Sequence, residues 1–146
     1  MTVEMKRGYY LLNTDGGMAS DGHPLAGQSP GIAAIGALLR TRRLAVVAEL
    51  AKTIGPATHN EAEYHGLIAG LKLAHHHGVE RLRVYMDSEL VVEQMNGFAD
   101  VKHARLKDLH DVAQSMAADF RSIRFSWVPR ELNAEADKLA RQAFAA

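Results

Sequence analysis

The stretch Gly8–Gly17, with the sequence GYYLLNTDGG, constrains the fold of this chain more than any other. Tyr9–Thr14 has the length and the aromatic and aliphatic composition of a β-strand, which we expect Asp15-Gly16-Gly17 to end. Alternate side chains point to opposite faces of a strand, and here both faces are largely apolar. Such a strand is covered on both sides, as in the centre of an α/β sheet. Taken alone, the stretch also fits an ordinary strand and turn, but Asp15 stands where α/β proteins carry their chemistry.

The composition predicts one globular domain over residues 1–146, since 47% of the residues are hydrophobic and 23% are charged. Basic and acidic residues both number 17, so any surface that attracts nucleic acid must be local. The chain has no cysteine, which excludes disulfides, thiolate metal sites and a cysteine nucleophile. Met1–Arg7 is too short and polar for a signal peptide, and no apolar run has membrane length. We therefore expect a cytoplasmic protein without a membrane anchor.

Gly16–Gly31 contains five glycines and two prolines and is predicted to be a loop. It lacks the Lys-Ser/Thr ending of a phosphate-binding P-loop, so a nucleotide site there has little support. Ile32–Leu39 and Leu44–Ala51 flank Arg40-Thr41-Arg42-Arg43 and predict a hairpin, with the second strand at or near the sheet edge. By composition, that second segment also fits a helix.

Thr58-His59-Asn60-Glu61 fits a capping box and predicts a helix that runs to about His77, with Gly78 as its terminator. On the helical wheel Glu61 falls on the solvent face, whereas Glu63 falls on the packed face. Burying a carboxylate costs several kcal/mol unless a cation or hydrogen-bond donors compensate it. Glu61 thus has a structural explanation, and Glu63 needs a functional one. Two glycines on the packed face would let the helix lie close against a sheet: Gly66 and Gly70.

Acidic residues also occur at the end of one further predicted strand and within the predicted last helix. Arg81–Met86 is predicted to be a strand that ends at Asp87-Ser88, followed by a short helix over Glu89–Asn96. An Asp-Ser pair there is also a common helix cap. After a fifth strand, Ser122–Val128, Asn133 is expected to cap a final helix, Ala134–Phe144. In that helix two acidic residues flank the packed face equally, so the wheel does not choose between them: Glu135 and Asp137.

Two basic groups have ordinary explanations. His75-His76-His77 looks like a metal cluster, but three consecutive helical residues point in three directions, which favours a solvated helix end. Lys102–Phe120 is predicted to be one amphipathic helix with a basic start. Its packed side would be formed by Leu106, Leu109, Val112, Ala113 and Met116, and its basic start by Lys102, His103, Arg105 and Lys107.

Four blocks then stand in one order along nearly the whole chain: DGG, THNEAEYHGLIAGL, YMDSELVVEQ and VPRELNAEADKLA. Together they resemble the motif blocks of type 1 ribonuclease H. The resemblance implies an α/β, ribonuclease H-like fold with a mixed five-stranded sheet in the order 3-2-1-4-5, strand 2 antiparallel, and helices on both faces. It implies catalytic, metal-binding roles for Asp15, Glu63, Asp87 and Asp137. It also implies substrate contacts by Gly16, Gly17, Thr58, Asn60 and Ser88.

The implied activity is metal-dependent endonucleolytic hydrolysis of the RNA strand of RNA–DNA hybrids, leaving 5′-phosphate and 3′-hydroxyl ends. Four adjacent carboxylates repel one another by several kcal/mol at separations of about 4 Å, so they stay ionised together only around multivalent cations. Oxygen ligands select hard ions, and the expected cofactor is a pair of Mg²⁺ ions, with Mn²⁺ as a substitute. We expect a monomer that acts on the hybrid without an obligate protein partner.

Two departures from the family pattern concern affinity and turnover. One plain helix replaces the basic protrusion of well-known bacterial members, and the segment before the last helix lacks their histidine. Arg130 and Glu131 occupy that segment, in a form that resembles a subgroup from archaea and some bacteria, and are our candidates for tuning product or metal release. The alternatives are a nuclease on this fold with another substrate, such as double-stranded RNA or a DNA–RNA junction, and a non-catalytic nucleic-acid-binding module. The presence of all four carboxylates argues against the second.

Overall fold

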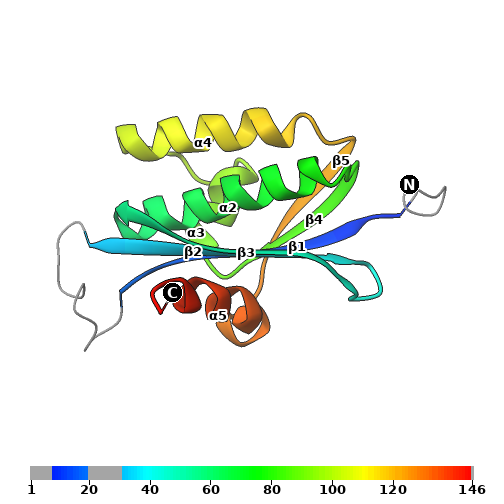
Figure 1. The fold of residues 1–146 in the computed structure, drawn as a ribbon. Helices are drawn as coiled ribbons and strands as arrows, with labels where there is room; N and C mark the ends of the chain where they lie inside the picture. Colours follow the sequence, from blue (N-terminus) through cyan, green and yellow to red (C-terminus); the bar gives the residue numbers. More distant parts are fainter. Residues whose placement is uncertain (1–7, 20–30, 146) are drawn as a thin grey trace.

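A computed structural model describes residues 8–19 and 31–145 of the chain. It contains one five-stranded sheet in the order β3-β2-β1-β4-β5 with helices on both faces (Figure 1). The strands are β1 Tyr10–Met18, β2 Ile32–Thr41, β3 Val46–Pro56, β4 Arg81–Met86 and β5 Ser122–Trp127. The helices are α2 His59–His76, α3 Glu89–Met95, α4 Ala104–Ala117, the 3₁₀ helix η1 Arg130–Asn133 and α5 Ala134–Ala143.

The predicted sheet is confirmed in its order and in the direction of its strands. β2 is antiparallel to both β1 and β3, whereas β4 and β5 run parallel to β1. The hairpin after the first strand is present, and its second arm is the edge strand β3 rather than a helix. Strand pairing decided this, because β3 pairs with β2 from Val46 to Pro56.

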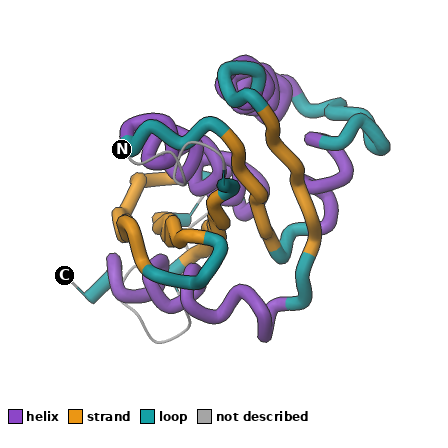
Figure 2. Tube along the Cα trace, turned by 90° about the vertical axis from the view of Figure 1, so that its right-hand side faces the viewer, coloured by secondary structure: helices purple, strands orange, loops and turns teal. Residues whose placement is uncertain are grey.

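The helices form a layer on each side of the sheet. α2 packs on β1 and β2, α4 packs on α2, and α5 packs on the opposite face of the sheet (Figures 1 and 2). The core lies between the sheet and α2, α3 and α4, and its fully buried side chains include Leu12, Leu39, Tyr64, Leu67, Leu71 and Val84. No helix in the described part of the chain combines the length and apolarity that a membrane crossing requires.

β1 does not end at Asp15-Gly16-Gly17, as the sequence suggested, but continues to Met18. Its antiparallel pairing with β2 extends to Met18 and Ala33, whereas its parallel pairing with β4 stops at Asn13 and Tyr85. The predicted loop over Gly16–Gly31 is therefore wrong at its start, because β2 supplies backbone partners there; residues 20–30 lie outside the described part. Past Asn13, β1 has a strand on one side only, which opens the carboxyl end of the sheet beside Asp15.

α2 confirms the capping box, with Thr58 and Glu61 each accepting from the other's amide, and Gly78 follows its end with φ of 73°. The predicted solvent position of Glu61 is wrong, since its side chain is 11% exposed. Its carboxylate turns back to the Thr58 amide, and the guanidinium of Arg105 lies 3.9 Å away. The three histidines at the end of this helix are exposed, as the solvated-end interpretation predicted.

α4 is shorter than the predicted Lys102–Phe120 helix, and its buried stripe is narrower. Leu106 and Ala113 are buried, but Val112, which the pattern assigned to the packed side, is 47% exposed. The reason is that α4 packs mainly against a single helix, α2.

Candidate active site

Three carboxylates from separate elements meet at the open end of β1. Asp15 comes from β1, Glu63 from α2, and Asp87 from the residue after β4. Each offers an oxygen that lies within 4.8 Å of the other two. The sequence allows this because α2 crosses β1 very closely: a methyl group on Gly16 would lie 2.1 Å from the Ala62 carbonyl oxygen. The Gly16 amide also donates a hydrogen bond to Glu63 Oε1.

The last helix brings a fourth carboxylate, Asp137, to the same place. Asp137 lines a cavity of about 330 Å³ together with Asp15 and Asp87, and its side chain is 17% exposed. Glu135, the other candidate on this helix, is 69% exposed and lies 3.7 Å from Arg40. Two arginines flank Asp137, with Arg141 at 3.1 Å and Arg130 at 3.9 Å. The helix thus presents Asp137, and not Glu135, to the carboxylate group.

Burial and mutual repulsion strongly disfavour the ionised forms of these groups. Burial raises the pKa of Asp15 to about 7, and the Asp87 and Asp137 charges add to the rise. Burial, followed by the charge of Asp15, raises the pKa of Glu63 to about 10. Burial also raises the pKa of Asp87 above its usual value, although a hydrogen bond from Asn133 and the charge of Arg130 oppose this. The protein alone therefore does not neutralise its own cluster.

The donor set of this cluster fits divalent cations. It consists of carboxylate oxygens alone, the ligands preferred by hard ions such as Mg²⁺ and Mn²⁺. Glu63 Oε2 is buried without a hydrogen-bond partner among the described residues, which is costly for an oxygen that carries charge. A cation would supply the missing partner and offset the repulsion among Asp15, Glu63 and Asp87.

Asn133 forms hydrogen bonds next to the carboxylate cluster, a role that the sequence did not reveal. We expected it to cap α5, and it does precede that helix, but its side chain makes no capping hydrogen bond. Instead it is 1% exposed, accepts from Asn13 Nδ2 at 3.0 Å and donates to the Thr14 carbonyl at 2.9 Å. β1 has lost β4 as a partner at Thr14, so the Asn133 side chain satisfies a carbonyl that would otherwise be unpaired.

The cavity beside the carboxylates contains some of the predicted substrate residues and omits others. Gly16 and Gly17 line it, as does Arg130 of the segment before α5. Thr58, Asn60, Ser88 and Glu131 are not among the described residues that line it; Thr58 and Ser88 cap α2 and α3. Sequence reasoning missed Met18, His59, Ala140, Arg141 and Phe144. Arg141 was detectable, because it stands four residues after Asp137 and must share its helix face.

A family model described as reverse transcriptase-like matches residues 20–143. The crystal structure of ribonuclease H1 from the halophilic archaeon Halobacterium salinarum superposes with a TM-score of 0.84 at 36% identity, and the match covers 94% of this chain and 98% of that one. The chain belongs to the ribonuclease H family.

Other ribonucleases H agree with this assignment. The N-terminal ribonuclease H domain of a Mycobacterium tuberculosis protein matches with a TM-score of 0.84 and 44% identity over 94% of both chains. LC11 ribonuclease H1, solved in complex with an RNA/DNA hybrid, matches with a TM-score of 0.81 and 33% identity, covering 93% of this chain and 96% of that one. The chain spans 35% of the length of the curated M. tuberculosis relative, a bifunctional protein that is 45% identical over 134 residues.

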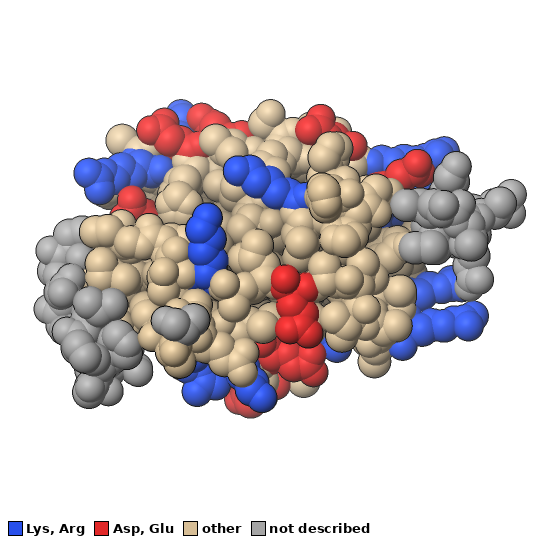
Figure 3. All heavy atoms as spheres, viewed as in Figure 1, with Lys and Arg blue, Asp and Glu red and all other residues tan. Residues whose placement is uncertain are grey.

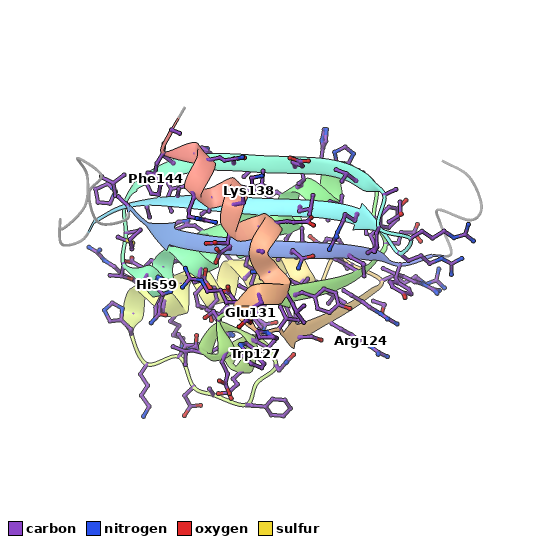
Figure 4. The ribbon with its side chains drawn as sticks, turned by 90° about the horizontal axis from the view of Figure 1, so that it is seen from below. His59, Arg124, Trp127, Glu131, Lys138 and Phe144 are labelled. Atoms are coloured by element: carbon purple, nitrogen blue, oxygen red, sulfur yellow. The ribbon has the colours of Figure 1, made fainter. Side chains whose placement is uncertain are left out.

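In this ribonuclease H, the segment before the last helix has regular secondary structure. It forms η1, a short 3₁₀ helix, rather than an irregular loop. Glu131 and Trp127 lie close to the start of α5 in Figure 4. The Trp127 indole donates to the Asp87 carbonyl at 3.2 Å, and the Val128 amide donates to the Met86 carbonyl at 2.9 Å. The end of β5 therefore holds the backbone on which Asp87 stands.

Proposed function

We propose that this chain is a metal-dependent endoribonuclease that hydrolyses the RNA strand of RNA–DNA hybrids. The observation that carries the proposal is the convergence of Asp15, Glu63 and Asp87 within 4.8 Å, with a buried oxygen of Glu63 that has no hydrogen-bond partner in the part of the chain that the structure describes. A related ribonuclease H1 solved with a hybrid supports the choice of substrate. The chain would act as a single domain and a monomer, without an obligate protein partner.

The four carboxylates would hold two divalent ions, Mg²⁺ or Mn²⁺, through Asp15, Glu63, Asp87 and Asp137. When bound, such ions supply Lewis acidity, which activates a water and stabilises the charge on the leaving 3′ oxygen. In-line attack by that water would leave 5′-phosphate and 3′-hydroxyl ends.

The residues of this chain would hold and orient the reacting groups. The Gly16 amide fixes one oxygen of Glu63, while Arg141 fixes Asp137. Gly16 and Gly17 line the cavity without side chains, so the sugar–phosphate backbone can come close to β1. Thr58 and Ser88 are the N-cap residues of α2 and α3, and Asn60 lies in the first turn of α2. Their hydroxyl and amide groups, with the free backbone N–H groups of the helix starts, suit contacts to phosphates and 2′-hydroxyls. Contacts to the 2′-hydroxyl would distinguish RNA from DNA.

A substrate panel tests this function. End-labelled RNA–DNA hybrid, double-stranded RNA, a DNA–RNA junction and double-stranded DNA are each incubated with Mg²⁺, Mn²⁺ or EDTA. We expect cleavage of the RNA strand of the hybrid with either metal, and none in EDTA. Hybrid cleavage in EDTA, or faster cleavage of double-stranded RNA than of the hybrid, would refute the proposal.

The segment before α5 offers a more specific prediction about turnover. The Arg130 guanidinium lies 3.9 Å from Asp137, and its side chain is 80% exposed. It can therefore leave the Asp137 carboxylate and bind the phosphate of the product as the product departs. Arg130→Ala should lower multiple-turnover kcat several-fold while single-turnover cleavage and hybrid Kd stay near wild type. Glu131→Ala is the matched control, since Glu131 is not among the residues that line the cavity. Equal multiple-turnover rates for Arg130→Ala and wild type would remove Arg130 from product release.

A further inference from the structure

Within residues 8–19 and 31–145, no helix packs over two strands on one face of the sheet. α5 packs against β1, β2 and β3, and β4 and β5 emerge beside it on the same side (Figure 4). On β4, Leu82, Val84 and Met86 are buried in the core under α2 and α4. Because side chains alternate along a strand, Arg81, Arg83 and Tyr85 point to the uncovered side, where all three are half-buried.

Positive charge is concentrated on this uncovered face. Arg83 pairs in register with Arg124 of β5, so the two side chains stand side by side on strands about 4.8 Å apart. Like charges opposite each other destabilise a sheet. Neither β4 nor β5 contains an acidic residue. Neither Arg83 nor Arg124 forms an ion pair with a carboxylate of residues 8–19 or 31–145. The arrangement is thus unfavourable for the protein alone and favourable for a bound anion.

Aromatic rings accompany these arginines. The Arg83 guanidinium carbon lies 3.8 Å from the centroid of the Tyr9 ring, which holds the guanidinium against the sheet. Tyr85 stands two residues further along the same face, opposite Ser126 of β5. On the side of the molecule shown in Figure 3, basic and acidic side chains are interspersed. A local group of arginines and tyrosines differs from that mixed pattern and matches the chemistry of surfaces that bind nucleic-acid strands.

We propose that Tyr9, Arg83, Tyr85 and Arg124, the arginine–tyrosine face, form an accessory binding surface for a single-stranded nucleic-acid segment next to the hybrid. The inference rests on the proposed function, which brings nucleic acid to Asp87. Arg83 precedes Asp87 by four residues on one strand, a separation of roughly 13 Å, which a few unpaired nucleotides can span. An unpaired strand is the occupant that fits, because only unstacked bases can reach tyrosine rings, while the arginines take the phosphates.

The test compares two hybrids that share one duplex, one blunt and one with a single-stranded tail of eight nucleotides. Kd is measured by fluorescence anisotropy in EDTA, so that cleavage does not interfere. We expect the wild type to bind the tailed hybrid at least five-fold more tightly than the blunt one. In Arg83→Gln/Arg124→Gln the ratio should fall to about one, and the salt slope for the tailed hybrid should become shallower by about 1.4, for two lost phosphate contacts.

The control is Lys52→Gln/Lys72→Gln, which removes the same charge from exposed lysines of β3 and α2 and should keep the wild-type ratio. A wild-type ratio in the arginine variant, or no tail effect in the wild type, would overturn the inference. So would a polyglutamate peptide that competes with the tail as well as single-stranded DNA does, since the surface would then recognise acidic protein. If the wild type bound the tailed hybrid more tightly but cleaved no hybrid with Mg²⁺, the proposed function would be refuted while the binding surface would be supported.

Discussion

Asn133 is the residue that joins the last helix to the central strand. Its amide group links the side chain of Asn13, the carbonyl of Thr14 and the carboxylate of Asp87, so one side chain connects Asp87 to the strand that carries Asp15. Its side chain is buried, so bulk solvent does not satisfy the groups that it bonds. Asn133 is therefore a positioning residue for the site.

We predict that Asn133→Ala lowers the free energy of unfolding by about 1–3 kcal/mol, because the Thr14 carbonyl and the Asn13 amide lose their partner in a buried site. The measurement is urea unfolding. Asn96→Ala is the matched control: Asn96 is exposed and its side chain donates to the Phe125 carbonyl at 3.1 Å, so the loss of this bond should cost less than about 1 kcal/mol. An equal decrease in the free energy of unfolding in the two variants would show that the buried hydrogen bonds of Asn133 stabilise the fold no more than an exposed one does.

Some residues of the site could be predicted from the sequence and others could not, for physical reasons. Glu63 could be predicted because the period of its helix puts it on the packed face, where a carboxylate needs compensation. Asp137 could not be separated from Glu135 by that argument, because both lie at the border of the packed face on the wheel of this helix. The role of Asn133 depends on where β1 and β4 separate, a tertiary feature that local patterns do not contain.

At the scale of elements, the contact between α2 and β1 determines the distance between Asp15 and Glu63. A methyl group on Gly66 would lie 2.6 Å from the Asp15 carbonyl oxygen, and one on Gly70 would lie 2.5 Å from Thr14 Cγ2. The spacing of these glycines predicted a close helix–sheet contact correctly. The strand end was predicted wrongly, since glycines usually break a strand, whereas pairing with β2 keeps Gly16 and Gly17 extended and α2 lies close to Gly16.

Gly66→Ala should therefore destabilise the protein by about 1–3 kcal/mol, although alanine is the better helix former by about 1 kcal/mol. The clash is with backbone, so α2 must move away from β1, and we expect hybrid cleavage to fall at least ten-fold as Glu63 moves from Asp15. Thermal unfolding and cleavage rates with Mg²⁺ measure both effects. Gly17→Ala is the stability control, because a methyl group there meets no described residue within 4 Å. An unchanged melting temperature in Gly66→Ala would contradict the close contact.

At the scale of the whole molecule, the fold gathers like charges that its own donors do not neutralise, so stability should depend on pH and metal together. Asp15 and Glu63 have pKa values raised to about 7 and about 10, whereas in the unfolded chain both titrate near 4. The folded state therefore binds more protons above pH 4, and their contribution to stability is lost as the pH rises towards these values.

We predict that the melting temperature in EDTA falls as the pH is raised from 5 to 8, and that Mg²⁺ raises it more at pH 8 than at pH 5. Differential scanning fluorimetry across this range measures both trends. The Asp15→Asn variant should show a weaker fall, because one of the titrating groups is gone. A melting temperature in EDTA that increased from pH 5 to pH 8 would contradict the raised pKa values.

The central claim is that the carboxylate cluster carries out the cleavage, and the cleavage rate of Asp87→Asn on an RNA–DNA hybrid with Mg²⁺ tests it most directly. This variant keeps the shape of the side chain and removes one charge. We expect no detectable cleavage, with a melting temperature in EDTA at neutral pH equal to or above that of the wild type, because repulsion is relieved. Glu61→Gln, two residues from Glu63 but bound to the helix cap, should still cleave and lose at most about 1 kcal/mol of stability. An active Asp87→Asn, or a folded but inactive Glu61→Gln, would show that the cluster is not the catalytic site.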